Sequence, residues 1–445
     1  MKSIEQLAEE WLHLDKDPET RREIVELLAS KNDRELEKRL RHRITFGTAG
    51  LRSRMQAGFA RMNSLTVVQA SQGLAHYLLE QLPDARQKGV VIGRDARHNS
   101  DKFAELAAAA FLANGIKVWW LERIVHTPLV PFAVRKLNAA AGIVITASHN
   151  PAQDNGYKVY WSNGCQIIPP HDTGIAAAIL GNVPPASWDI EMVKGGHKLL
   201  EHTLDRLEND YFAAVKHLVQ FDNSELVPHF VYTPMHGVGL HYMLQALKQV
   251  LGPPPHDSPP HSKYISPCTV VAEQANPDPD FPTVQFPNPE ETGALALAMR
   301  TADAHSTTLI LATDPDADRL AVAEKLPNGA WHQFTGNQLG VLLASSVLES
   351  PSGLGETTVI SSPCSAPRSP RACSAKWPPS KASTSSRRSR VSNGSGTLRS
   401  GSPRKKATMC HSPSKKPSAT CSRTSCTTKT ESPPRWCFLL PQQSG

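Results

Sequence analysis

Cysteine and long apolar runs are scarce in the first 360 residues of this chain. Only Cys165 and Cys268 occur there, which excludes a disulfide framework and favours a reducing compartment. The longest apolar stretch, residues 106–113, is far too short to span a bilayer. The N-terminus turns acidic at Glu5 and has no apolar core, so no secretory signal is expected. We therefore predict a soluble cytoplasmic protein with no membrane partner.

Acidic residues are almost absent from residues 361–445. This segment holds 16 Lys or Arg against one acid, Glu431, together with 21 Ser and 11 Pro. The rest of the chain holds 32 basic and 40 acidic residues, so the formal charge of +7 comes from the tail. With no Ile, Tyr or Asp, the tail lacks the apolar surface needed to offset chain entropy, and it has no zinc-type Cys-x-x-Cys pair. We predict that residues 358–445 are disordered.

The chain that remains is centred on Thr146–Pro151, Thr-Ala-Ser-His-Asn-Pro. Residues 141–147 predict a buried strand, and Asn150-Pro151 turns the chain. Ser148 then lies where a strand enters a loop, the edge at which open α/β sheets bind ligands. It can act as a nucleophile or phosphoryl carrier; the alternative is that it only caps the strand.

A serine-hydrolase triad is disfavoured around Ser148. The sequence has no Gly-x-Ser-x-Gly elbow at this point. His149 is the next residue, and neighbours on an extended chain point to opposite faces. We therefore expect His149 to be poorly placed to take the proton of Ser148.

Helical and strand patterns alternate through the first 200 residues. Residues 3–42 predict helices, which start at a capping box formed by Ser3 and Gln6. Further on, three strands alternate with two helices, which implies parallel strands joined by crossovers. The strands lie at 89–93, 116–121 and 141–147, and the helices at 100–113 and 128–137. Residues 157–161 and 165–168 predict a hairpin.

A second α/β unit follows a Pro- and Gly-rich linker at 181–198. We predict strands at 230–233, 269–272, 308–312 and 320–324, and helices at 242–250, 290–302 and 338–348. The fold class is therefore α/β, with two consecutive domains that carry mixed, largely parallel sheets.

Three aspartates stand at alternate positions after the strand at 308–312: Asp314, Asp316 and Asp318. Carboxylates this close repel one another unless a cation offsets them, and oxygen ligands suit Mg²⁺. The alternatives are solvated carboxylates on an Asp-Pro turn, or an EF-hand. The EF-hand is rejected because Arg319 and Lys325 stand where its loop needs Gly and Glu.

Three basic residues accompany these groups. Arg52 ends a Gly-rich loop, Phe46–Arg52, whose N–H groups can approach an anion, and its guanidinium can clamp phosphate. Arg319 follows the aspartates directly. Lys158 can serve as a general acid or base at an accepting hydroxyl. Taken singly, the loop is an ordinary turn and Lys158 an ordinary surface lysine.

Together these motifs resemble the α-D-phosphohexomutase family, within it the branch of phosphopentomutases and glucose-1,6-bisphosphate synthases. The residues are Phe46–Arg52, Thr146–Pro151, Asn155–Lys158, Asp278–Thr283 and Asp314–Arg319. The resemblance covers residues 1–357 and implies an intramolecular phosphotransferase for sugar phosphates. By resemblance, Ser148 is the phosphoserine and a metal ligand, Asp314, Asp316 and Asp318 hold Mg²⁺, Arg52 and Arg319 contact phosphate, and His149 and Lys158 line the catalytic centre. A sugar bisphosphate is the implied activator.

The resemblance also implies a division of the chain. Residues 1–42 are N-terminal helices, 43–200 a first domain with the phosphoserine, 201–335 a second with the metal loop, and 336–357 the start of a third. Family members continue into third and fourth domains that select the sugar and hold its distal phosphate, and these are not recognisable after residue 357. We therefore expect impaired mutase activity. The alternative is a non-catalytic product whose basic tail binds nucleic acid or acidic partners, although it lacks an RNA-binding motif. The sequence does not decide between a hexose and a pentose substrate or between a mutase and a bisphosphate synthase, and it leaves the oligomeric state open.

Overall fold

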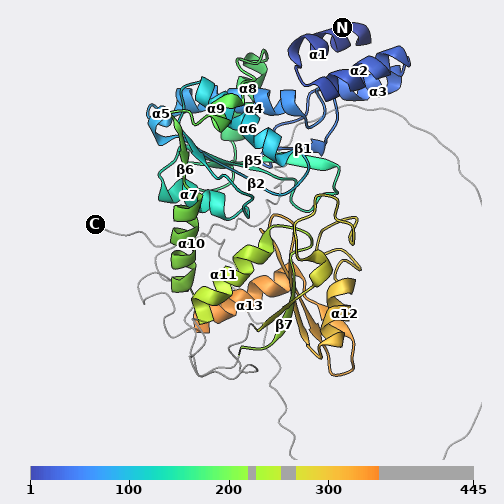
Figure 1. Ribbon diagram of the computed structural model, residues 1–445, viewed down its shortest axis with the longest axis vertical. Helices are drawn as coiled ribbons and strands as arrows, with labels where there is room; N and C mark the ends of the chain where they lie inside the picture. Colours follow the sequence, from blue (N-terminus) through green and yellow to red (C-terminus); the bar gives the residue numbers. More distant parts are fainter. Residues whose placement is uncertain (1, 219–226, 252–266, 350–445) are drawn as a thin grey trace, which may run out of the picture. The chain divides into compact units, whose positions relative to one another are not determined.

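The computed structural model describes residues 2–218, 227–251 and 267–349 (Figure 1). The predicted disordered tail therefore lies outside the described residues, as does the basic segment proposed to bind acidic partners. Within the described part, two α/β sheets follow a small helical unit.

The N-terminal unit consists of α1 (Ile4–Leu14), α2 (Pro18–Ala29) and α3 (Asp33–Leu40). The predicted capping box is present, since the Ser3 hydroxyl accepts from the Gln6 N–H and the Gln6 side chain accepts from the Ser3 N–H. The core of this unit is shared with the segment that follows it, since Trp11 packs edge-on against Phe59 with ring centroids 5.1 Å apart.

The first sheet has the strand order β1-β5-β4-β2-β3-β6. Neighbouring β4, β2, β3 and β6 are parallel, whereas β5 pairs antiparallel with both β4 and β1. The strand bounds are β1 (Leu51–Arg54), β2 (Val90–Arg94), β3 (Val118–Trp120), β4 (Ala141–Ile145), β5 (Asp154–Trp161) and β6 (Leu200–His202). The sheet is mixed and largely parallel. The boundary expected between the first and second domains, between residues 200 and 201, falls inside β6.

Helices cover both faces of this sheet and bury a separate apolar cluster on each. The long helix α4, which the sequence patterns did not predict, packs with α6 and α8, while α7 and α10 contribute to the second cluster. The helix bounds are α4 (Ser64–Gln81), α5 (Ala85–Lys88), α6 (Ser100–Ala113), α7 (Leu129–Lys136), α8 (His171–Gly181), α9 (Glu191–Lys194) and α10 (Leu204–Leu218).

The hairpin predicted at residues 157–168 is present in part. Residues 165–168 form no regular strand, but Tyr160 and Gln166 make an isolated antiparallel bridge, and the Trp161 and Ile167 N–H groups donate to the Cys165 and Val159 carbonyls at 2.8 and 3.2 Å. β1 pairs with β5 only at Asp154–Tyr157, so the same edge of β5 is open beyond Tyr157 and accepts this short return of the chain.

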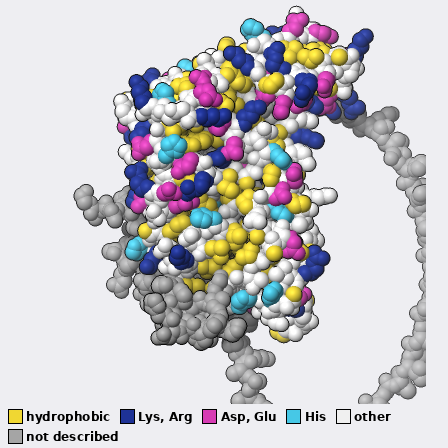
Figure 2. All heavy atoms as spheres, viewed as in Figure 1, with side chains coloured by type: hydrophobic (Ala, Val, Ile, Leu, Met, Phe, Trp, Pro, Cys, Tyr) yellow, Lys and Arg dark blue, Asp and Glu magenta, His cyan; other side chains and the backbone are white. Residues whose placement is uncertain are grey.

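The second sheet has the order β11-β10-β9-β7-β8, parallel around β7 and antiparallel at β9, β10 and β11. Its strands are β7 (Phe230–Thr233), β8 (Cys268–Val270), β9 (Leu309–Thr313), β10 (Leu320–Lys325) and β11 (Trp331–Gln333). Its helices are α11 (Gly239–Leu251), α12 (Ala296–Ala304), α13 (Gly336–Glu349) and the short 3₁₀ turn η1 (Ala272–Gln274). Apolar side chains stay exposed on α11 and α13, including Leu244 and Val341, and Figure 2 shows hydrophobic atoms gathering there.

Candidate active site

Ser148 lies in the loop that follows β4, in a conformation unusual for a residue with a side chain. Its φ is +53°, in the left-handed region, and only 1% of its surface is exposed. The Thr146 hydroxyl accepts the Ser148 N–H at 2.8 Å, and the Ser148 Oγ donates to Asp314 Oδ2 at 2.8 Å. A nucleophile-type hydroxyl is thus held against a carboxylate from the second sheet.

The expectation that His149 points away from Ser148 is wrong. His149 Nδ1 lies 3.2 Å from Ser148 Oγ. The opposite-face argument assumed an extended chain, but the left-handed φ at Ser148 brings the two neighbouring side chains together. Burial, helped by the charges of Arg319 and Arg52, lowers the pKa of His149 to about 4, so the ring is neutral at pH 7.

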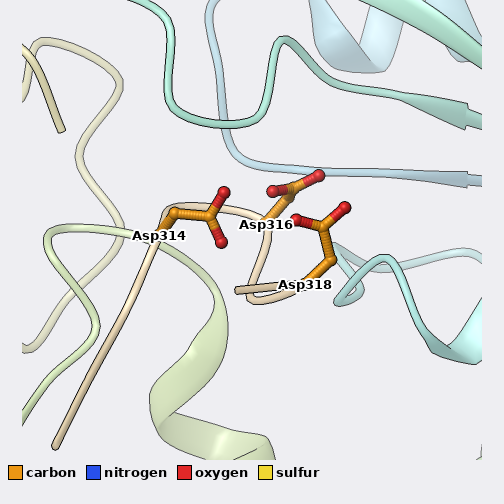
Figure 3. A group of neighbouring side chains, drawn as sticks. All are labelled: Asp314, Asp316 and Asp318. Carbon is orange, nitrogen blue, oxygen red and sulfur yellow. The ribbon is translucent and has the colours of Figure 1, made fainter. Parts of the chain in front are cut away.

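The three predicted aspartates follow β9 on one tight loop (Figure 3). One carboxylate oxygen from each of Asp314, Asp316 and Asp318 lies within 4.8 Å of the others. Asp314 and Asp316 are fully buried. The turn is closed by Ala317, whose φ is +52°, and the Ala317 N–H donates to the Asp314 carbonyl at 2.9 Å.

Electrostatics at this loop favour a bound cation. Burial above all, and then repulsion by the neighbouring Asp316 and Asp318, raise the pKa of Asp314 well above its usual value. Asp316 Oδ1 is buried without a hydrogen-bond partner among the described residues. A crowded, acidic, oxygen-only donor set with an unpartnered oxygen fits a hard divalent metal ion.

Lys158 supplies positive charge at the same loop. It projects from β5, only 6% of its surface is exposed, and its Nζ lies 2.6 Å from Asp316 Oδ2 and 2.6 Å from Asp318 Oδ2. These carboxylates raise its pKa against the lowering effect of burial. The alternative of an ordinary surface lysine is therefore wrong.

The two predicted phosphate-binding arginines also come to this place. Arg52 on β1 donates to Asn150 Oδ1 at 3.3 Å, within the Ser148 loop. Arg319 donates its backbone N–H to Asp314 Oδ1 at 3.2 Å, and its Nε lies 3.9 Å from Asp314 Oδ2. Its side chain is 41% exposed. Both guanidiniums leave N–H donors for a ligand.

Comparisons with known protein families give the same assignment as these motifs. Residues 43–183 match phosphoglucomutase/phosphomannomutase, alpha/beta/alpha domain I, and residues 209–328 match domain II of the same family. The chain belongs to the phosphoglucomutase/phosphomannomutase family. The predicted α/β fold with two such domains is thereby confirmed.

Members of this family with known names include both pentose- and hexose-related proteins. The chain is 48% identical to a phosphoribomutase of Saccharomyces cerevisiae, over 75% of this chain and 54% of the relative. It is 44% identical to a human glucose 1,6-bisphosphate synthase, over 75% and 53%. A Thermus thermophilus structure assigned as a phosphomannomutase matches with a TM-score of 0.54 and 27% identity, over 68% of this chain and 61% of the other. The chain spans about half the length of the curated relatives it matches.

Arg97 and Asp95, which the sequence patterns did not single out, hold the Ser148 loop in place. The Arg97 guanidinium donates to four carbonyl oxygens of one loop, at 2.7, 2.6, 2.9 and 3.2 Å; these belong to Ser148, Asn150, Pro151 and Asp154. Its Nε lies 3.3 Å from Asp95 Oδ2, and both side chains are 1% exposed. A usable signal existed, because Asp95-Ala-Arg97 directly follows β2, which is parallel to β4 and ends at the same sheet edge.

Thr127 joins the two sheets beside the aspartates. Its hydroxyl donates to Asp316 Oδ2 at 2.6 Å, and its N–H donates to the Asp316 carbonyl at 2.8 Å. This double contact holds the loop of the three aspartates against the first sheet.

None of the helices in the described ranges has the length and hydropathy that crossing a bilayer requires.

Proposed function

We propose that this chain carries out phosphoryl transfer between Ser148 and sugar phosphates, as the first half of a phosphosugar mutase reaction in the cytoplasm. The observation that carries the proposal is the placement of Ser148 Oγ 2.8 Å from Asp314 Oδ2, on a loop whose three carboxylates lie within 4.8 Å. This places a hydroxyl that can bear phosphate beside a set of oxygen ligands suited to a divalent cation.

Each predicted residue takes a role consistent with its position. Asp314, Asp316 and Asp318 would hold Mg²⁺, together with phosphate on Ser148. When bound, the metal ion supplies positive charge that offsets the charge of the transferring phosphoryl group. Arg52 and Arg319 bind phosphate oxygens through guanidinium N–H groups.

The transfer step moves one phosphoryl group from Ser148 to the sugar and one proton from the sugar hydroxyl to Ser148. The bond from phosphorus to Ser148 Oγ breaks as a bond from a sugar hydroxyl oxygen to phosphorus forms. We assign His149 and Lys158 to move the proton of that hydroxyl, which ends on Ser148 Oγ as the bond to phosphorus breaks. The product is a sugar bisphosphate, and return of its other phosphoryl group to Ser148 completes an isomerisation. A sugar bisphosphate is therefore also the reagent that primes the serine.

The sugar is a pentose or a hexose phosphate, because the relatives named above include a phosphoribomutase and a glucose 1,6-bisphosphate synthase. The described residues provide the phosphoryl-carrying groups for either sugar. Direct comparison of the two bisphosphates as phosphoryl donors decides between them.

The test is transfer of labelled phosphate from glucose 1,6-bisphosphate or ribose 1,5-bisphosphate, with Mg²⁺ present, onto the full chain. We expect label on the wild type and none on Ser148→Ala. Ser53→Ala is the matched control, because Ser53 is a partly buried serine that donates only to the Ala60 carbonyl, at 3.3 Å. Equal labelling of Ser148→Ala, or no labelling of the wild type by either donor, would contradict the proposal.

A further inference from the structure

A cavity on the first domain lies beside the Phe46–Arg52 loop. Its volume is about 250 Å³, room for roughly eight water molecules at ~30 Å³ each. Its walls come from the segment before β1, from Phe59, and from α4 and α8. Most of the lining is apolar and includes Phe46, Leu51, Phe59, Ala176, Ile179 and Leu180.

One cationic side chain, Arg43, also lines this cavity. It donates to Gln69 Oε1 at 2.8 Å, and its guanidinium carbon lies 4.4 Å from the centroid of the Phe59 ring. It forms no ion pair with any residue in the described ranges. Because a guanidinium has five N–H donors, most of them stay available for a ligand.

Two arginines that precede Arg43 contact carboxylates instead. Arg39 lies 2.7 Å from Glu23 and 3.0 Å from Glu35, and Arg41 pairs with Glu37 at 2.5 Å. Burial lowers the pKa of Arg43, and the more distant carboxylate of Glu10 raises it. A partly desolvated charge with no carboxylate of the described residues in direct contact is costly, and an anion beside it would reduce that cost.

We propose that this cavity binds a small apolar carboxylate, with the carboxylate on Arg43 and the hydrocarbon body against the apolar walls. A carboxylate matches one guanidinium in charge and in bidentate geometry. A phosphate would bring close to two negative charges into a cavity whose lining has one positive charge, on Arg43. The volume lies just below the range of pockets for drug-sized ligands, ~300–1,000 Å³, and so selects a compact acid.

The cavity shares a wall with the proposed active site. Phe46 and Leu51 line it, and between them the chain turns through reciprocal hydrogen bonds of Gly47 and Gly50, at 3.3 and 2.8 Å. The next residue is Arg52, which contacts Asn150 in the Ser148 loop. Resting on the proposed function, we infer that the bound acid changes the rate of phosphoryl transfer through the position of Arg52.

The binding test is calorimetry on the full chain with 3-phenylpropionate, with its neutral amide and inorganic phosphate as comparison ligands. We expect a Kd of about 1 mM or tighter for the acid, and binding at least about tenfold weaker for the amide, for phosphate and for Arg43→Gln. Leu180→Glu, a change at a 61% exposed rim position, should weaken the acid similarly by repulsion. Arg41→Gln, which alters a paired arginine, should bind as the wild type does.

The outcomes separate this site from the proposed function. Ser148→Ala should still bind the acid, because the cavity does not include Ser148. Absence of saturable binding, or equal binding by Arg43→Gln and the wild type, would overturn the site. Saturating acid should change the Ser148 labelling rate at least about twofold in the wild type; an unchanged rate in an acid-bound, labelling-competent chain would overturn the coupling.

Discussion

Arg97 offers the sharpest test of how the Ser148 loop is held. Replacing Arg97 by Ala removes a guanidinium bonded to four loop carbonyls and leaves Asp95 buried without its partner. Adding four charge-assisted bonds at about 1.5–3 kcal/mol each would overshoot, because bonds to one group are not independent. Breaking a buried ion pair costs about 3–5 kcal/mol, which is the loss of unfolding free energy that we expect.

The functional loss should be separable from the loss of stability. Arg97→Lys keeps a positive charge beside Asp95 but cannot reach four carbonyls with one fork. We expect it to be folded, yet to label Ser148 about 100-fold more slowly, as small misplacements of reacting groups do. Arg123→Ala is the control, because Arg123 is 55% exposed and its nearer partner, Asp205 at 2.7 Å, is 78% exposed, while Glu208 lies 3.4 Å away; such surface pairs contribute below about 1 kcal/mol each.

The measurements are urea unfolding, followed by intrinsic fluorescence, and the labelling rate of Ser148. If Arg97→Ala lost no more stability than Arg123→Ala, the buried pair would not be a structural support. If Arg97→Lys labelled at the wild-type rate, the loop carbonyls would not set the position of Ser148.

Three further predictions concern the metal loop, a turn and a buried histidine. Asp316→Ala should abolish Mg²⁺ binding in calorimetry, and unchanged affinity would exclude this aspartate as a ligand. Gly50→Ala should lower the melting temperature, because its φ is +72° and an added Cβ would lie 1.8 Å from the Tyr157 carbonyl oxygen; an unshifted transition would contradict that geometry. Burial lowers the pKa of His126 to about 3, below its unfolded value near 6.5. The contribution of His126 to the free energy of unfolding is therefore fully present above pH 6.5. It is lost as pH falls toward 3, by up to about 1.4 kcal/mol per pH unit. His126→Phe should flatten stability against pH in this window, and parallel wild-type and variant curves would refute the assignment.

The parts of the site that could be predicted are those set by local sequence. A β-branched run before Ser148 and an apolar run before Asp314 both give strands, and polar residues just after such strands come to a sheet edge. The left-handed φ at Ser148 could not be predicted, because Ser carries no preference for it. The burial of Lys158 arises only when the loop at 314–318 meets β5, which is a tertiary event.

The unpredicted elements of the fold have similar causes. Helix α4 buries most of its residues on every side, so it lacks the polar stripe by which periodicity identifies a helix. The hairpin at 157–168 forms only at its turn, because β1 takes the edge of β5 up to Tyr157 and leaves only the end of β5 for residues 165–168. In each case the partner that decides the structure lies far away in the sequence.

Backbone strain at the junction of the two sheets connects these observations. Non-glycine residues with left-handed φ occur in the Ser148 loop, in the aspartate loop at Ala317 (+52°), and at Met235 (+49°), His236 (+59°) and Phe281 (+47°). Such conformations cost about 1–3 kcal/mol each and persist only where contacts over-determine them. Some of those contacts cross between the sheets: the Arg97 guanidinium lies 4.9 Å from the Phe281 ring centroid, and the Thr127 hydroxyl donates to Asp316 Oδ2 at 2.6 Å. The strained loops therefore support one another, and the position of Ser148 depends on the second sheet as much as on the strand that carries it.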